Sequence, residues 1–189
     1  MRNIRLRKFV LSAMFLSLGL VLPFLTGQIP EIGNMLLPMH IPVMLCGLVC
    51  GWQYGLAVGM ATPLMRSIIF MRPVFYPNAV AMAFELAAYG LIIGLVYHRS
   101  KWQCLRSLYR ALIASMLGGR LLWGIVQMIL LGVGENGFTL TMFLSGAFLT
   151  AIPGIVLQLV LIPIVMVALD RTKLVPFTKK EEKGACVCR

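Results

Sequence analysis

Residues 78–97 read NAVAMAFELAAYGLIIGLVY, and this stretch decides the fold class. It is 20 residues long and contains a single charged side chain, Glu85. About 20 consecutive apolar residues are needed for a helix to cross a hydrocarbon core roughly 30 Å thick. The stretch therefore predicts a transmembrane helix.

The rest of the chain has the same apolar character. Of its 189 residues, 60% are hydrophobic and only 12% are charged, and the mean hydropathy is +0.91. A soluble domain needs a more polar surface than this composition provides. We predict an all-α integral membrane bundle of six transmembrane helices, at about residues 9–25, 36–50, 54–71, 78–97 and 111–131 and within 141–169.

The basic residues predict the orientation of these helices. Cytoplasmic loops retain an excess of Lys and Arg because these side chains are poorly translocated. Fourteen of the 17 Lys and Arg residues lie in three segments, at residues 2–8, 99–110 and 171–189. We therefore expect both termini in the cytoplasm, with residues 1–170 forming a transmembrane substrate-binding domain and residues 171–189 a basic cytoplasmic tail.

Several classes of function are not favoured by the sequence. The formal charge of +11 comes from clusters between apolar runs, which is typical of membrane topology and does not indicate nucleic-acid binding. The chain has no Gly-rich phosphate loop, no zinc-type Cys and His spacing, and no Gly-x-Ser-x-Gly or His-Glu-x-x-His motif. We expect no cofactor, no metal and no enzymatic activity, and any energy from ATP must come from a partner.

Ionisable and polar side chains inside the predicted helices indicate a site. A charged residue at the centre of a membrane helix costs about 2.5 to 3.5 kcal/mol on insertion scales, so it normally faces other helices or water. Asn78, Met82, Glu85 and Tyr89 share one helical face, which we expect to point inward.

A second polar face is predicted on the fifth helix. Arg120, Trp123 and Gln127 follow one another at intervals that place them on one side of a helix. Arg66 and His40 lie near the predicted outer ends of the third and second helices. All of these candidate substrate-binding residues converge on the outer half of the bundle.

Two interpretations of these groups remain open. Glu85 and Arg120 either form a buried ion pair that fixes helix packing, or they line a pocket that binds a small molecule. His40 is alternatively a loop anchor, and Arg66 is alternatively a side chain that reaches the outer interface. Gln158 is expected at a helix kink with its amide satisfied, or else near the same pocket.

A different signal lies in the first helix. Ala13 and Ser17 form a small-xxx-small motif, which lets another helix approach closely. The motif is compatible with packing inside the chain and with contact to another protein.

Taken together, these features resemble the substrate-binding S component of energy-coupling factor (ECF) vitamin transporters. The resemblance rests on six predicted spans in about 190 residues, on the basic ends, and on residues 33–47, GNMLLPMHIPVMLCG, which are similar to the start of the second helix in such proteins. Ala13 and Ser17 match the Ala-xxx-Ala contact of that family, with Ser in place of the second Ala.

The resemblance implies a subunit of the bacterial plasma membrane that captures a vitamin or related precursor outside the cell. Its implied partners are a transmembrane coupling subunit and two cytoplasmic ATPases. Residues 33–47 look most like S components assigned to pantothenate. In that case Arg66 or Arg120 would hold the carboxylate, while Gln127 and Asn78 would meet amide or hydroxyl groups.

Other functions compete with this one. A solitary secondary transporter would use Glu85 as its proton-coupling carboxylate. A membrane-embedded enzyme would use Glu85 and His40 as acid and base, although no catalytic motif supports it. A purely structural membrane scaffold would bind no ligand.

Overall fold

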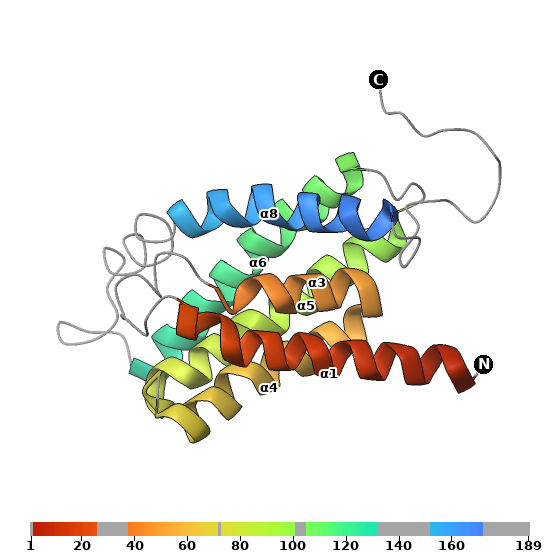
Figure 1. Cartoon of the computed structure of the whole chain (residues 1–189). Helices are drawn as coiled ribbons and strands as arrows, with labels where there is room; N and C mark the ends of the chain where they lie inside the picture. Colours follow the sequence, from red (N-terminus) through yellow and green to blue (C-terminus); the bar gives the residue numbers. More distant parts are fainter. Residues whose placement is uncertain (1, 26–37, 72, 101–104, 132–151, 172–189) are drawn as a thin grey trace.

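The computed structural model describes residues 2–25, 38–71, 73–100, 105–131 and 152–171 (Figure 1). Within these ranges all regular elements are helical, which confirms the all-α class. The elements are α1 (Arg2–Leu25), α3 (His40–Cys50), α4 (Trp52–Phe70), the π-helical turn η1 (Phe75–Ala79), α5 (Val80–Arg99), α6 (Leu105–Leu131) and α8 (Ile152–Arg171).

Four of the described helical segments are long and apolar enough to cross a membrane. They cover Arg5–Phe24, Phe75–Arg99, Leu105–Leu131 and Ile152–Asp170. By contrast, α3 has only 11 residues, which corresponds to about 16 Å of helix. The described residues therefore contain four helices that could cross a membrane, whereas the six-span count and the cytoplasmic termini stay predictions.

The predicted helix boundaries differ from the observed ones mainly at their starts. The first helix was expected from residue 9 but begins at Arg2, and the fifth was expected from residue 111 but begins at Leu105. The second was expected from residue 36, whereas α3 begins at His40. The early part of that prediction, most of the basic tail and the region before α8 lie outside the described residues.

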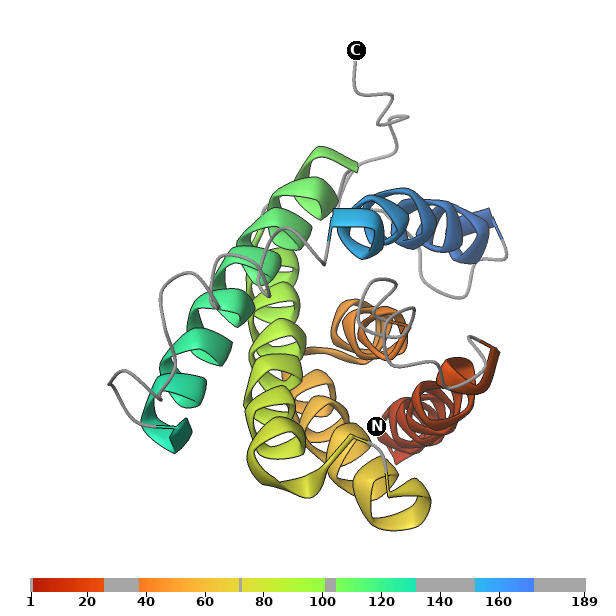
Figure 2. The ribbon, with the colours of Figure 1, turned by 90° about the vertical axis from the view of Figure 1, so that its left-hand side faces the viewer.

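The short helix α3 occupies the centre of the bundle, and the view along the bundle shows its neighbours (Figure 2). It packs against α1, α4, α5 and α8, while α6 packs against α5 and α8. Ten of its 11 residues are buried. This central position explains why α3 is almost wholly apolar although it is short.

Glycines allow α3, α4 and α5 to touch through their backbones. A Cβ atom on Gly90 of α5 would lie 2.2 Å from the carbonyl oxygen of Gly55 on α4. A Cβ atom on Gly47 of α3 would lie 2.7 Å from the carbonyl oxygen of Gly90. Small residues commonly serve this purpose between membrane helices. Two more close pairs join α4 to α5: Gly59 with Leu86, and Gly94 with Trp52.

The outer surface of α6 is apolar along its length. Its exposed residues recur at every fourth position, at Ile113, Leu117, Leu121, Ile125 and Ile129. A helix in a membrane can expose such a stripe because lipid, not water, surrounds it. This face is therefore available to lipid and is not part of the polar interior.

The α4–α5 connection lies at one end of the bundle. At this end, α1, α4 and α6 finish while η1 and α8 begin, at the left of Figure 1; we call it the η1 end. The Ser67 hydroxyl donates to the carbonyl of Pro73 at 2.7 Å. The Tyr76 hydroxyl donates to the carbonyl of Leu130 at 2.8 Å, which ties η1 to the end of α6.

Candidate functional site

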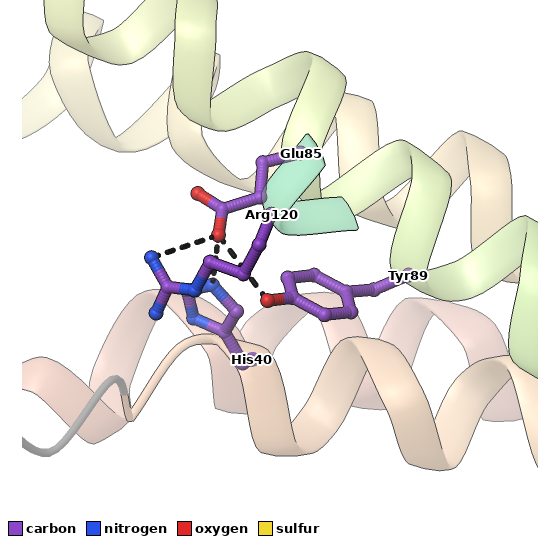
Figure 3. A network of polar contacts seen from close by, with 4 residues as sticks. All are labelled: His40, Glu85, Tyr89 and Arg120. Carbon is purple, nitrogen blue, oxygen red and sulfur yellow. Dashed lines mark hydrogen bonds and ion pairs between the residues drawn. The ribbon is translucent and has the colours of Figure 1, made fainter. Parts of the chain in front are cut away.

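Glu85 lies at the centre of a buried polar network formed by α3, α5 and α6 (Figure 3). Its Oε1 atom is 3.2 Å from Nη1 of Arg120 and 3.7 Å from Nε2 of His40. The same oxygen accepts a hydrogen bond from the Tyr89 hydroxyl at 3.3 Å. Glu85 is 2% exposed, Arg120 6% and His40 0%. The structure thus brings four of the eight predicted substrate-binding residues together.

Helical spacing and close packing explain how these side chains meet. Glu85 and Tyr89 are four residues apart on α5, so they lie on the same face. Gly119 lies directly before Arg120 on α6, and a Cβ atom there would be 3.0 Å from the Tyr89 ring. The absence of that atom lets the ring lie flat against α6. The rings of Tyr89 and His40 meet edge to face, with centroids 5.1 Å apart.

The network lies deep in the bundle. Arg120 is eleven residues before the last residue of α6, which places it roughly 16 Å from the η1 end. That depth is about half of a 30 Å hydrocarbon core. Removing one partner from a buried ion pair typically costs about 3 to 5 kcal/mol, since the other charge is left uncompensated. Glu85 and Arg120 therefore stabilise each other's position.

Several polar atoms of this network have no hydrogen-bond partner in the described part of the chain. They are Nδ1 and Nε2 of His40 and Nε and Nη2 of Arg120. Buried polar groups are nearly always paired, so each unpaired one calls for an explanation. The network contains more hydrogen-bonding capacity than an ion pair that serves packing alone would use.

Two buried glutamines extend the unpaired groups toward the η1 end. Gln127 is seven residues beyond Arg120 on α6, on the same face and about 10 Å along the axis. Its Oε1 atom has no hydrogen-bond partner within the described helices and turns. Gln158 of α8 is 1% exposed, and its Nε2 atom is also unpaired. The described residues do not fully satisfy the Gln158 amide, and its alternative place near the pocket stays a prediction.

Arg66 does not lie in the Glu85 network, although a substrate pocket that included all the predicted residues would place it there. It is 5% exposed, and its Nη1 atom donates to the carbonyl of Leu20 on α1 at 2.9 Å. Its guanidinium carbon lies 5.4 Å from the ring centroid of Phe24 and 5.7 Å from that of Phe70. Within the described residues these contacts join α1 to α4, and they do not include the Glu85 network.

The remaining predicted residues lie nearer the η1 end than the network. Asn78 is exposed within η1, seven residues before Glu85. Trp123 is half-buried on α6, one turn beyond Arg120. The roles of both side chains in the site stay predictions.

The predicted partner-contact residues lie on an open face of α1. Ala13 and Ser17 are both exposed, and Met14 and Val21 are exposed beside them. The Ser17 hydroxyl donates to the carbonyl of Met14 at 2.8 Å, within its own helix. Packing inside the described chain therefore does not account for this small-xxx-small motif.

Sequence reasoning missed the glycines that set the spacing of the site. Gly55 and Gly59, and likewise Gly90 and Gly94, form two Gly-xxx-Gly motifs, which are a sequence signal for close helix contact. It also missed Gly119, because a single glycine next to Arg120 gives no sequence signal comparable to a Gly-xxx-Gly motif. In the part of the chain that the structure describes, no group of three or more potential ligands is arranged for a metal ion.

Comparison with known proteins gives one match. The model of a family described as "ECF transporter, substrate-specific component" matches residues 7–166. No curated protein and no solved structure matches the chain. The matched range includes all four residues of the Glu85 network and both small residues of the α1 face.

Proposed function

The chain belongs to the family of ECF transporter substrate-specific components, and from this premise we propose that it captures a small carboxylate-bearing vitamin or vitamin precursor at the Glu85 network. Membership makes it a multi-pass cell-membrane protein that binds a small substrate and associates with membrane-embedded coupling and ATPase components. It is a transport subunit and not an enzyme. Pantothenate is our leading substrate.

The proposed topology has six spans with both termini in the cytoplasm. The basic residues of α1, such as Arg5 and Arg7, and those at the junction of α5 and α6, such as Arg99 and Arg106, all lie at the end opposite η1. The positive-inside rule places that end in the cytoplasm. The η1 end then faces outside, and the substrate enters from there.

The main support for the proposal is the edge of the Arg120 guanidinium formed by Nε and Nη2, which has no partner among the described residues. The Nη1 atom of Arg120 pairs with Glu85, whereas Nε and Nη2 are buried and have no hydrogen-bond partner among the described residues. These two nitrogens direct parallel N–H bonds along one edge of the guanidinium, which matches the two oxygens of a carboxylate. Glu85 thus orients Arg120 and leaves its bidentate edge open for a ligand.

Gln127 adds a constraint on the length of the substrate. Its Oε1 atom has no partner in the described ranges and can accept a hydrogen bond from a ligand, and Gln127 lies about 10 Å beyond Arg120 toward the η1 end. A ligand that reaches both residues has a carboxylate at one end and an N–H or O–H donor toward the other. Pantothenate has this chemistry, because its carboxylate is joined through an amide to a hydroxylated end.

Thermal unfolding of the purified protein against a vitamin panel tests the proposal. A ligand present at 100 times its dissociation constant stabilises the folded state by about 2.7 kcal/mol, which gives a clear shift. We expect pantothenate or another carboxylate vitamin to give the shift. Arg120→Lys keeps a cation beside Glu85 but loses the bidentate edge, so affinity should fall about 10- to 100-fold.

Leu121→Ala is the matched control, because Leu121 is the next residue on α6 and faces outward. It should leave the ligand-induced shift unchanged. No shift with any vitamin in folded protein would contradict the proposal, as would equal affinity of the Arg120→Lys protein for the carboxylate ligand. Uptake that needs a proton gradient and no ATPase would favour the solitary secondary transporter instead.

A further inference from the structure

His40 has an unusual position for a histidine. It is the first residue of α3, is 0% exposed, and neither of its ring nitrogens makes a hydrogen bond to the described part of the chain. Its Nε2 atom is 3.7 Å from Oε1 of Glu85, which is longer than a hydrogen bond. Figure 3 shows the ring beside the Glu85 carboxylate, at ion-pair distance but without a hydrogen bond to it.

The charged and titratable groups around His40 come mainly from α5 and α6. Glu85 and Tyr89 face it from α5, and Arg120 reaches the same carboxylate from α6. The buried cation of α4, Arg66, is held by Leu20 and two aromatic rings.

The other helices around His40 add no charge near it. The described cations of α1 with placed side chains lie at residues 5–8, at the opposite end of that helix from Leu20. The Asp170 side chain is close to the far end of α8, and the buried Gln158 of that helix is uncharged. On α3 itself, Cys46 and Cys50 are one and a half or more turns away.

These groups define the charge balance of the site. The charges of Glu85 and Arg120 cancel, and the network is neutral overall when His40 is neutral. A ligand carboxylate on the free edge of Arg120 adds one negative charge in a place where charge is costly unless it is compensated. Glu85 already pairs with Arg120 and accepts a hydrogen bond from Tyr89, so among the described groups His40 is the one that can restore neutrality by gaining a proton without weakening these contacts.

We propose that His40 takes up one proton when the carboxylate ligand binds, so that substrate capture by this protein is proton-linked. This inference rests on the proposed function, since it requires a carboxylate at Arg120. The proton goes from solvent to an imidazole nitrogen, and no covalent bond of the ligand changes. The resulting imidazolium then donates to Glu85 or to the ligand.

The expected consequence is a dependence of affinity on pH with a definite sign. Binding that takes up a proton becomes weaker as pH rises, and one proton corresponds to about a tenfold loss of affinity per pH unit. This holds over the range in which His40 is neutral in the free protein and charged in the complex.

Calorimetric titration tests the proton uptake directly. Pantothenate, or whichever carboxylate vitamin stabilises the protein, is titrated at one pH in phosphate and in Tris, which differ in ionisation enthalpy. We expect uptake of nearly one proton and its loss in His40→Gln. The chain has only two histidines, so His98→Gln, at the exposed far end of α5, is the matched control and should retain full uptake.

A second measurement covers the case in which His40→Gln no longer binds ligand. In protein labelled with ¹³C-histidine, the His98→Gln variant assigns the signal of His40. Addition of saturating ligand, at the pH used for calorimetry, should move that signal toward the imidazolium position. A neutral His40 in the complex would overturn the inference.

The possible failures are distinguishable. If a carboxylate vitamin binds without proton uptake, or with uptake that persists in His40→Gln, the inference is wrong but the proposed function stands. If folded protein binds no carboxylate vitamin, both are wrong.

Discussion

Replacing Gly90 with alanine should force α4 and α5 apart and destabilise the whole protein. The added Cβ atom would lie 2.2 Å from the carbonyl oxygen of Gly55 and 2.3 Å from its carbonyl carbon. Ordinary contact begins at 3.4 Å, so the two backbones must separate by about 1.2 Å. Both contacting groups are backbone, so a side-chain rotation cannot relieve the clash.

The expected loss of folding stability is large because several helices meet at Gly90. Overpacking of a core typically costs about 1 to 3 kcal/mol. Gly47 of α3 touches the same Gly90 carbonyl, so three helices must adjust together. We expect a loss near the upper end of that range, which lowers the melting temperature by roughly 6 to 12 °C for a chain of this size.

Thermal unfolding in detergent measures this effect, and Gly118→Ala provides the matched control. The Cβ atom added at Gly118 would meet only the side chain of Ile92, at 2.4 Å from its terminal methyl group. That methyl group can rotate away, so this variant should melt within about 2 °C of the unmodified protein. Equal melting temperatures for Gly90→Ala and Gly118→Ala would refute the close-packed arrangement of α3, α4 and α5.

Three other substitutions probe separate features. Gln127→Leu removes a buried unpaired acceptor, so we expect ligand affinity to fall while the ligand-free protein melts at the same or a higher temperature; a drop in both would show a structural role. Arg66→Met should cost about 1.5 to 3 kcal/mol of stability through the lost bond to Leu20, with ligand affinity at 20 °C unchanged; loss of affinity in folded protein would place Arg66 in the site. Ser17→Leu should reduce co-purification of the coupling subunit without altering ligand binding, whereas Ser17→Ala should do neither.

The centre of the site could be predicted because its signals were local and strong. A glutamate and an arginine inside apolar helices are costly unless they are paired, and Tyr89 follows Glu85 by one turn. These rules need no knowledge of how the helices are arranged. The inward position of Glu85 and Arg120 therefore followed from their energetics, whereas their pairing was one of two interpretations that the sequence left open.

The role of Arg66 could not be predicted in the same way. Its partners are a backbone carbonyl on α1 and two aromatic rings, and neither gives a sequence signal that distinguishes it from a ligand-binding arginine. The shortness of α3 was also hidden, because apolar residues continue before His40 in the sequence. Both features depend on how helices distant in sequence pack together.

The hydroxyl of Ser17 has a consequence for how α1 meets different surroundings. Its hydrogen bond to the carbonyl of Met14 is made within the helix, so a neighbour need not supply an acceptor. To an approaching surface Ser17 is therefore nearly equivalent to alanine, which explains how it can stand in place of the second small residue of the motif. This face can be covered first by lipid chains and then by a protein helix, or the reverse. In either case the Ser17 hydroxyl keeps its hydrogen bond to Met14.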